Sequence, residues 1–252
     1  MRMKSTLCVC ITFCLCTGLT AQQPDAAKAQ AAPTRAPRTP YYIDPAILDL
    51  SSLLPDPPSP DSAMNKAELD ELHRIEQART AEQIAQAKED EAEEDMFVFK
   101  TVLGSRFLSD ALPLTTALGA HVKNEQSVVG GQLKRAMQRP RPYQTDATLH
   151  PVCKVGTTHD SYPSGHALTG YLEALTLAEM VPEKRTEILA RADEYAHNRE
   201  VCGVHYPSDV DASREVAYAV FGYMLATPRF QRDLATAREE LRTKLDLPRK
   251  QN

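Results

Sequence analysis

The sequence has little of three features that mark other classes of protein. Beyond its N-terminus, no apolar run reaches the ~18 residues that a membrane-spanning helix needs. Its 29 basic and 34 acidic residues give a net charge of −5, so nothing indicates the strongly basic surface of a nucleic-acid-binding protein. It has 10 glycines, few β-branched runs and no internal repeat, which argues against a sheet and against a repeat architecture.

Residues 1–21 have the layout of a secretory signal peptide. Arg2 and Lys4 form a positive segment, an apolar core covers 7–15, and Ala21 supplies the small residue expected at a cleavage site. A transmembrane anchor is the alternative, but the core is short and no basic cluster follows it. Lipidation at Cys16 is a weaker alternative, because the preceding residues match a lipobox poorly. We expect export to the periplasm or medium, with no stable membrane insertion after cleavage.

The predicted signal peptide determines which cysteines remain in the exported chain. Four of the six lie inside the predicted signal peptide, which leaves Cys153 and Cys202. Two cysteines in an exported chain predict one disulfide. On the chain-entropy estimate it would contribute roughly 4 kcal/mol to stability. Two buried free thiols are the alternative.

Proline divides the chain. Residues 22–60 hold nine of the 18 prolines, which predicts a Pro/Ala-rich linker and extended arm. The apolar residues of the arm should lie on the domain surface: Ile47, Leu48, Leu50, Leu53 and Leu54. Helical periodicity over 61–248 predicts an all-α domain. We expect helices near 62–94, 113–138, 164–180, 183–200, 208–226 and 228–245, a helical region from Met96, and a solvated acidic face at 88–95.

Two clusters of residues could bind an anion. Lys134 and Arg141 lie where a cationic helix end runs into a proline-stiffened loop, although a solvated basic patch is the simpler interpretation. Ser164, Gly165 and His166 occupy the predicted N-terminus of a helix, where free N–H groups and the helix dipole favour an anion. An ordinary helix cap followed by an incidental histidine is the alternative there.

A third cluster surrounds His205. Helical spacing turns Arg199 and Asp209 toward the apolar interior, and each of these buried charges needs a partner. They could pair with each other. Alternatively, Arg199 is free to bind a phosphate and Asp209 accepts the Nδ1–H of His205.

Together the clusters resemble the three-part signature of the type 2 phosphatidic acid phosphatase superfamily. The matching segments are Lys134, six residues, Arg141-Pro142; Pro163-Ser164-Gly165-His166; and Arg199, five residues, His205, three residues, Asp209. This spacing selects Arg141 over Arg139. Asn198 stands where the family usually has Ser, so we expect altered tuning rather than loss of activity. Residues 60–245 are similar to bacterial class A non-specific acid phosphatases.

The resemblance implies an all-α helical bundle with the phosphate pocket between helices, preceded by the Pro-rich arm. It implies a phosphomonoesterase of broad range that forms a phosphohistidine on His205, with Asp209 as its partner and His166 as acid and then base. The implied phosphate-binding residues are Lys134, Arg141, Ser164, Gly165 and Arg199. It implies no metal and no cofactor, an acid-shifted bell-shaped pH profile, small phosphomonoesters rather than nucleic acid as partners, and possible homo-oligomers.

Two other functions and one metal site stay open at this point. A vanadate-dependent haloperoxidase has the same oxyanion cradle. A non-catalytic phosphate- or partner-binding protein could use the Pro-rich arm and the acidic helix as its interaction surface. A zinc site from His150, His159 and His166 is conceivable, although its spacing matches no common zinc motif.

Overall fold

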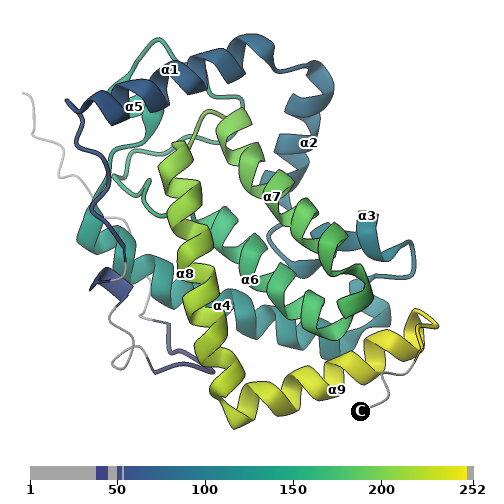
Figure 1. Ribbon diagram of the computed structural model, residues 1–252. Coiled ribbons are helices and arrows are strands. Elements are labelled where there is room, and N and C mark those ends of the chain that lie inside the picture. The colour runs from purple at the N-terminus through teal and green to yellow at the C-terminus, as the bar shows by residue number, and fades with distance from the viewer. Residues whose placement is uncertain (1–37, 45–49, 53, 249–252) are drawn as a thin grey trace, which may run out of the picture. The chain divides into compact units, whose positions relative to one another are not determined.

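Helices form the framework of this protein (Figure 1). A computed structural model describes residues 38–44, 50–52 and 54–248, and these contain no strand. The predicted all-α class is therefore confirmed. The predicted signal peptide and the first part of the arm lie outside the described residues.

The helices correspond closely to the periodicities of the sequence from residue 113 onward. The α-helices are α1 (Ala63–Ala78), α2 (Ala81–Ala92), α3 (Lys100–Leu103), α4 (Pro113–Met137), α5 (Pro142–Thr145), α6 (Gly165–Met180), α7 (Arg185–Val201), α8 (Pro207–Ala226) and α9 (Pro228–Lys244). The 3-10 helices are η1 (Leu50–Ser52), η2 (Met96–Phe99), η3 (Ser109–Ala111) and η4 (Pro182–Lys184). Proline occupies the first turn of α4, α5, α8 and α9, where its missing N–H has no partner to lose.

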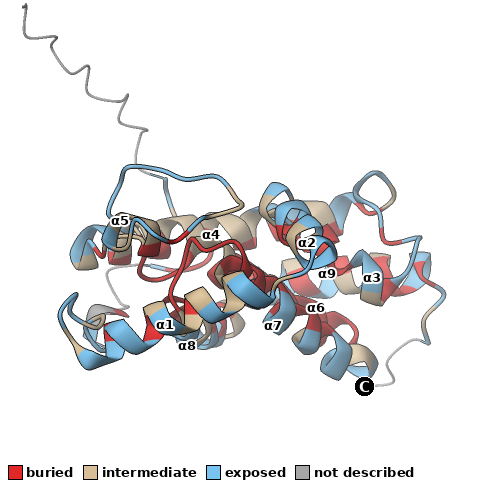
Figure 2. Ribbon diagram, turned by 90° about the horizontal axis from the view of Figure 1, so that it is seen from above, coloured by how far each residue is buried: buried red, intermediate tan, exposed pale blue. Residues whose placement is uncertain are grey.

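Helix α6 lies at the centre of the bundle. It packs against α4, α7 and α8, and 13 of its 16 residues are buried (Figure 2). A helix that is mostly apolar around its whole circumference can be stable in water only when other elements surround it. The N-terminus of α6 is therefore held rigidly inside the protein, next to the ends of its neighbours.

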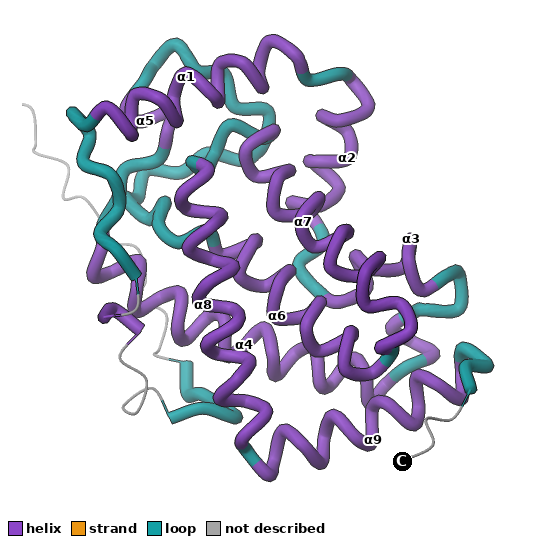
Figure 3. Tube along the Cα trace, viewed as in Figure 1, coloured by secondary structure: helices purple, strands orange, loops and turns teal. Residues whose placement is uncertain are grey.

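The predicted helix over 62–94 is wrong, because the chain breaks at Arg79 (Figure 3). Thr80 and Gln83 form a capping box, in which the Thr80 hydroxyl accepts from Gln83 N at 3.3 Å and Gln83 Oε1 accepts from Thr80 N at 2.8 Å. The Arg79 guanidinium stabilises the chain at this break by donating to the carbonyls of Val201 and His150, both at 2.7 Å. The break sends α2 along α7 instead of continuing the direction of α1.

The arm is more deeply buried than the sequence predicted. Tyr42 and Ile43, at 6% exposure each, and Leu50 and Leu54, at 4% and 6%, belong to the main hydrophobic core rather than to the surface. Ile47, Leu48 and Leu53 lie outside the described residues.

Candidate active site

A cavity of about 570 Å³ opens where α2, α6 and α7 end or begin beside the loop that follows α4. The predicted site residues in its lining are Lys134, Arg141, Gly165, His166, Arg199 and His205. Asp209 and Ser164 are fully buried and lie outside this lining. The structure therefore brings residues from distant parts of the chain to one place.

His205 lies in the short turn between α7 and α8. Gly203 reverses the chain there with φ +74°, a backbone conformation that favours glycine. Asp209 follows in the first turn of α8, and its Oδ2 accepts from Tyr206 N at 2.9 Å and lies 3.2 Å from His205 Nδ1. Because a carboxylate can only accept, the proton of this imidazole belongs on Nδ1. Its Nε2 lone pair is left for the cavity, where Arg141 Nη1 lies at 2.7 Å.

Arg139, which the motif spacing set aside, is the counter-charge of Asp209. Its guanidinium is 4% exposed and reaches Asp209 Oδ1 and Glu68 Oε2, each at 2.7 Å. It also lies over the ring of Tyr206, 3.8 Å from the centroid. Arg139 therefore pairs with the carboxylate that contacts His205 Nδ1, whereas Arg141 lines the cavity beside His205 Nε2. The sequence offered the R-x-R pattern but no sign of which partner each arginine takes.

The three predicted phosphate-binding cations, Lys134, Arg141 and Arg199, are already paired with protein oxygens. Arg141 Nε lies 2.9 Å from Asp160 Oδ1, and Lys134 Nζ donates to the carbonyl of Asp160. Arg199 Nη2 lies 3.3 Å from Glu91 Oε1, so the predicted alternative of an Arg199–Asp209 pair does not occur. Arg199 Nε is buried without a hydrogen-bond partner among the described residues. Arg199 lines the cavity, and a buried guanidinium with an unpaired N–H has a donor left for an anion such as phosphate.

The N-terminus of α6 closes another side of the cavity. Ser164 is its N-cap, and its hydroxyl accepts from Ala167 N at 3.4 Å, so this side chain holds the helix end rather than lining the cavity. A Cβ on Gly165 would lie 3.4 Å from Gln126 Nε2 and 3.8 Å from Lys134 Cε, on the cavity wall. Glycine therefore keeps open the space in which an oxyanion can approach the free N–H groups.

The acidic run at 88–95 is not the solvated face that we predicted. Asp90 is 3% exposed, while Glu91 and Glu94 line the cavity. Glu94 Oε1 lies 2.8 Å from His166 Nε2, and Glu91 pairs with Arg199. The sequence could not reveal this, because a charged run has the same pattern whether it faces water or a cluster of buried cations.

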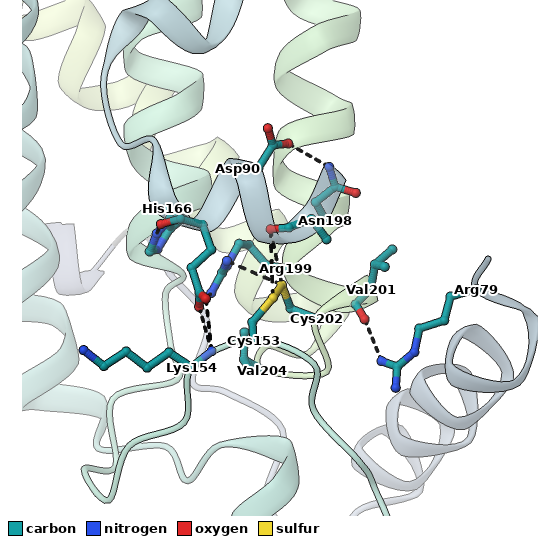
Figure 4. The surroundings of a disulfide bond; sticks show 12 residues. Arg79, Asp90, Cys153, Lys154, His166, Asn198, Arg199, Val201, Cys202 and Val204 are labelled. Carbon is teal, nitrogen blue, oxygen red and sulfur yellow. Dashed lines mark hydrogen bonds and ion pairs between the residues drawn. A yellow bond between two sulfur atoms is a disulfide. The ribbon is translucent and has the colours of Figure 1, made fainter. Parts of the chain in front are cut away.

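Asp90 anchors this acidic segment to α7. It accepts from Arg191 Nη2 at 2.5 Å. It also accepts from Asn198 Nδ2 at 2.7 Å (Figure 4). Asn198, the residue that departs from the family pattern, therefore faces α2 rather than the cavity. Its amide fixes the end of α2 over the site.

A disulfide joins Cys153 to Cys202, with 5.2 Å between the Cα atoms (Figure 4). Lys154, the next residue, donates its backbone N–H to Glu91 at 3.0 Å. Arg199 Nη1 donates to Cys202 Sγ at 3.6 Å. The bond thus ties the loop at 154–160, which forms one wall of the cavity, to the end of α7.

Burial and the crowding of cations set the protonation of the site. Burial lowers the pKa of His205 well below its usual value, and Arg141, Lys134 and Arg199 add to that effect. Burial, followed by Arg141, lowers the pKa of Lys134 to about 8. Burial raises the pKa of Asp209, while Arg139 opposes that rise. Burial and these cations therefore both favour the neutral form of the His205 imidazole.

No group of His, Cys, Asp or Glu side chains in the described part of the chain is arranged to hold a metal ion. The zinc site considered from the sequence does not form, because His150 pairs with Glu76 and His166 with Glu94. Across 38–44, 50–52 and 54–248, no helix combines the length and the apolar character that crossing a bilayer demands.

The sequence is similar to a known family and to known acid phosphatases. Residues 111–233 match the PAP2 superfamily. The chain is 29% identical over 225 residues to a non-specific acid phosphatase of Salmonella typhimurium, which covers 84% of this chain and 88% of that protein. It is 44% identical over 80 residues to a non-specific acid phosphatase of Providencia stuartii, about 32% of each chain. A solved structure, the transmembrane PAP2 type phosphatidylglycerolphosphate phosphatase from Bacillus subtilis, aligns with a TM-score of 0.45 at 17% identity, over 70% of this chain and 89% of that one.

The matched segment contains all three clusters that surround the cavity, from Lys134 to Asp209. Residues 111–233 of this chain therefore belong to the PAP2 superfamily.

Proposed function

We propose that this protein is an acid phosphatase that hydrolyses phosphate monoesters through a phosphohistidine on His205. One observation carries the proposal: the unprotonated Nε2 of a buried imidazole, held by Asp209, lies 2.7 Å from Arg141 Nη1 in a cavity that Lys134 and Arg199 also line. The non-specific acid phosphatase of Salmonella typhimurium, matched over 88% of its length, supports it.

In the first step, His205 Nε2 attacks phosphorus in line with the ester oxygen. The P–O bond breaks as the P–N bond forms, and His166 gives a proton to the departing alkoxide. The imidazole of His205 becomes a cation, which Asp209 stabilises through Nδ1–H. The product alcohol leaves, and the phosphoryl group stays on His205.

In the second step, water replaces the histidine. His166, now neutral, takes a proton from the water as its oxygen attacks phosphorus, and the P–N bond breaks to release neutral His205 and inorganic phosphate. In both steps Lys134, Arg141, Arg199 and the N–H of Gly165 stabilise the charge on the transferring PO3 group. The substrate phosphate must displace the carboxylates Asp160 and Glu91 from two of these cations.

Hydrolysis of p-nitrophenyl phosphate tests the proposal. Wild type should turn over in EDTA, and an alkaline quench during turnover should trap phosphate on His205, since a phosphohistidine survives base better than acid. His205→Ala should lose both turnover and label, whereas Glu82→Gln, on the exposed side of α2, should lose neither. Full activity of His205→Ala would remove this residue from the nucleophile role.

The cavity indicates a broad substrate range, because the groups identified in it grip the phosphate rather than the alcohol. We further propose a periplasmic or secreted location, supported by the predicted signal peptide and by the disulfide. Cell fractionation tests this location, and retention of the protein in the reducing cytoplasm would contradict it.

A further inference from the structure

The imidazole of His166 makes its contacts through one nitrogen. Its Nε2 lies 2.8 Å from Glu94 Oε1 and 3.2 Å from the carbonyl oxygen of Glu91, and these are its hydrogen-bonding contacts within the described residues. Both partners are acceptors, so Nε2 carries a proton. Nδ1 is then the atom that exchanges a proton with substrate and water in the cavity.

Glu94 is suited to hold that proton in place. Its side chain is 37% exposed, and Lys123 Nζ lies 3.0 Å from its other oxygen. The hydrogen bond with His166 lowers the pKa of Glu94 to about 2, with smaller contributions from Lys123. The carboxylate is therefore ionised wherever an acid phosphatase works.

Hydrogen bonds fix the backbone on both sides of Glu94. Asp90 is buried against Arg191 and Asn198 on α7, which secures the last turn of α2. Asp95 then caps η2 by accepting from Phe97 N at 2.9 Å. Glu94 lies between two anchored segments, so its carboxylate is pre-organised toward His166 rather than held there by chance.

We propose that Glu94 is a positioning residue that fixes the orientation and tautomer of His166 for proton transfer to the leaving group. The inference rests on the proposed function. The site then holds two matched dyads, Asp209 with the nucleophile and Glu94 with the acid. Glu94 does not touch the reacting atoms; it keeps Nε2–H in place while Nδ1 loses its proton to the alkoxide and regains one from water. Without the carboxylate, the ring can rotate or change tautomer and spends less time in the productive state.

A comparison of two substrates with different leaving groups tests the role of Glu94. An alkyl alkoxide needs the proton from His166, whereas p-nitrophenolate departs readily without it. Glu94→Gln keeps the shape of the side chain and removes its charge. We expect kcat/KM for glycerol 2-phosphate to fall about 10- to 100-fold, part of the usual contribution of a general acid, and that for p-nitrophenyl phosphate to fall less than about 3-fold. Glu94→Asp should recover part of the loss.

Glu93→Gln is the matched control, since Glu93 is adjacent, pairs with Lys100 and does not line the cavity. It should leave both substrates unaffected. In a His166→Ala background, Glu94→Gln should cause no further loss on glycerol 2-phosphate, because its effect acts through the imidazole.

Urea unfolding of each variant separates a folding defect from a catalytic one. Equal losses on both substrates by folded Glu94→Gln, or an undiminished loss in the His166→Ala background, would overturn the inference while leaving the proposed function intact. Inactivity of wild type on both substrates would instead refute the proposed function.

Discussion

Arg139→Gln is the substitution that best tests how the site is held together. Its guanidinium neutralises two buried carboxylates, Asp209 at 0% and Glu68 at 9% side-chain exposure. Removing one partner of a buried charge pair costs about 3–5 kcal/mol, because the remaining charge is left without compensation. Since two carboxylates lose their partner here, we expect about 4 kcal/mol or more, a large part of the roughly 5–15 kcal/mol that stabilises a typical domain.

The same substitution should damage catalysis by a predictable route. Burial already raises the pKa of Asp209 and Arg139 opposes it, so loss of Arg139 raises that pKa further. A protonated Asp209 no longer fixes the Nδ1–H tautomer of His205 as a carboxylate does. We expect kcat on p-nitrophenyl phosphate to fall by about 100-fold or more, as when the carboxylate of a catalytic triad is neutralised.

Urea unfolding followed by circular dichroism measures the first effect, and steady-state kinetics the second. The midpoint should fall by about 2 M for an m-value near 2 kcal/mol/M. Arg74→Gln, which removes an arginine with 71% of its side chain exposed, should shift it by less than about 0.5 M. Adding Glu68→Gln to Arg139→Gln should restore part of the stability by removing one uncompensated charge. An Arg139→Gln protein as stable and as active as wild type would refute the reasoning.

Three further outcomes are expected. Because Lys134 loses its charge as the pH rises through about 8, kcat/KM should fall above that pH through a rising KM. Lys134→Arg should move this alkaline limb of the pH profile to higher pH. An unchanged alkaline limb in that variant would assign the limb to another group. Asn198→Ser shortens the side chain that donates to Asp90, so it should lower the free energy of unfolding by about 1–2 kcal/mol in urea titrations while kcat changes little, and a large kcat effect would contradict the placement of Asn198 away from the cavity. Replacing Cys153 and Cys202 by Ser opens a loop with a sequence separation of 49, so the free energy of unfolding should drop by roughly 4 kcal/mol. KM should also rise, because the loop carries Lys154 and Asp160, which line the cavity. An unaltered KM would show that the cavity wall keeps its shape without the disulfide.

Local patterns determined much of this protein. Apolar periodicity placed the long helices α4, α6, α7, α8 and α9 within about two residues, because their buried faces repeat at the helical period, whereas the four-residue helix α5 was not predicted. The same periodicity turned Arg199 and Asp209 inward, and both are buried. The motif spacing selected Arg141 for the cavity, where it lies beside His205.

Where the sequence failed, the missing information was the identity of a distant partner. The capping box at Thr80 was present in the sequence, yet the apolar and charged pattern ran through it and hid the break between α1 and α2. The acidic run was expected in solvent because its pattern carries no record of Arg191, Arg199 and His166, which lie far along the chain. Arg139 was set aside because a motif specifies spacing and not what stands behind a catalytic carboxylate.

The sequence by itself thus determined the family, the long helices from residue 113 onward and most of the charged residues that line the cavity on α4, α6 and α7, since all of these depend on short-range spacing. Tertiary structure alone decided the other charge pairs around the cavity: Asp209 with Arg139, Glu94 with His166, and Glu91 with Arg199. Charge pairing depends on distance in space and on burial, and only packing of the folded chain sets these two quantities.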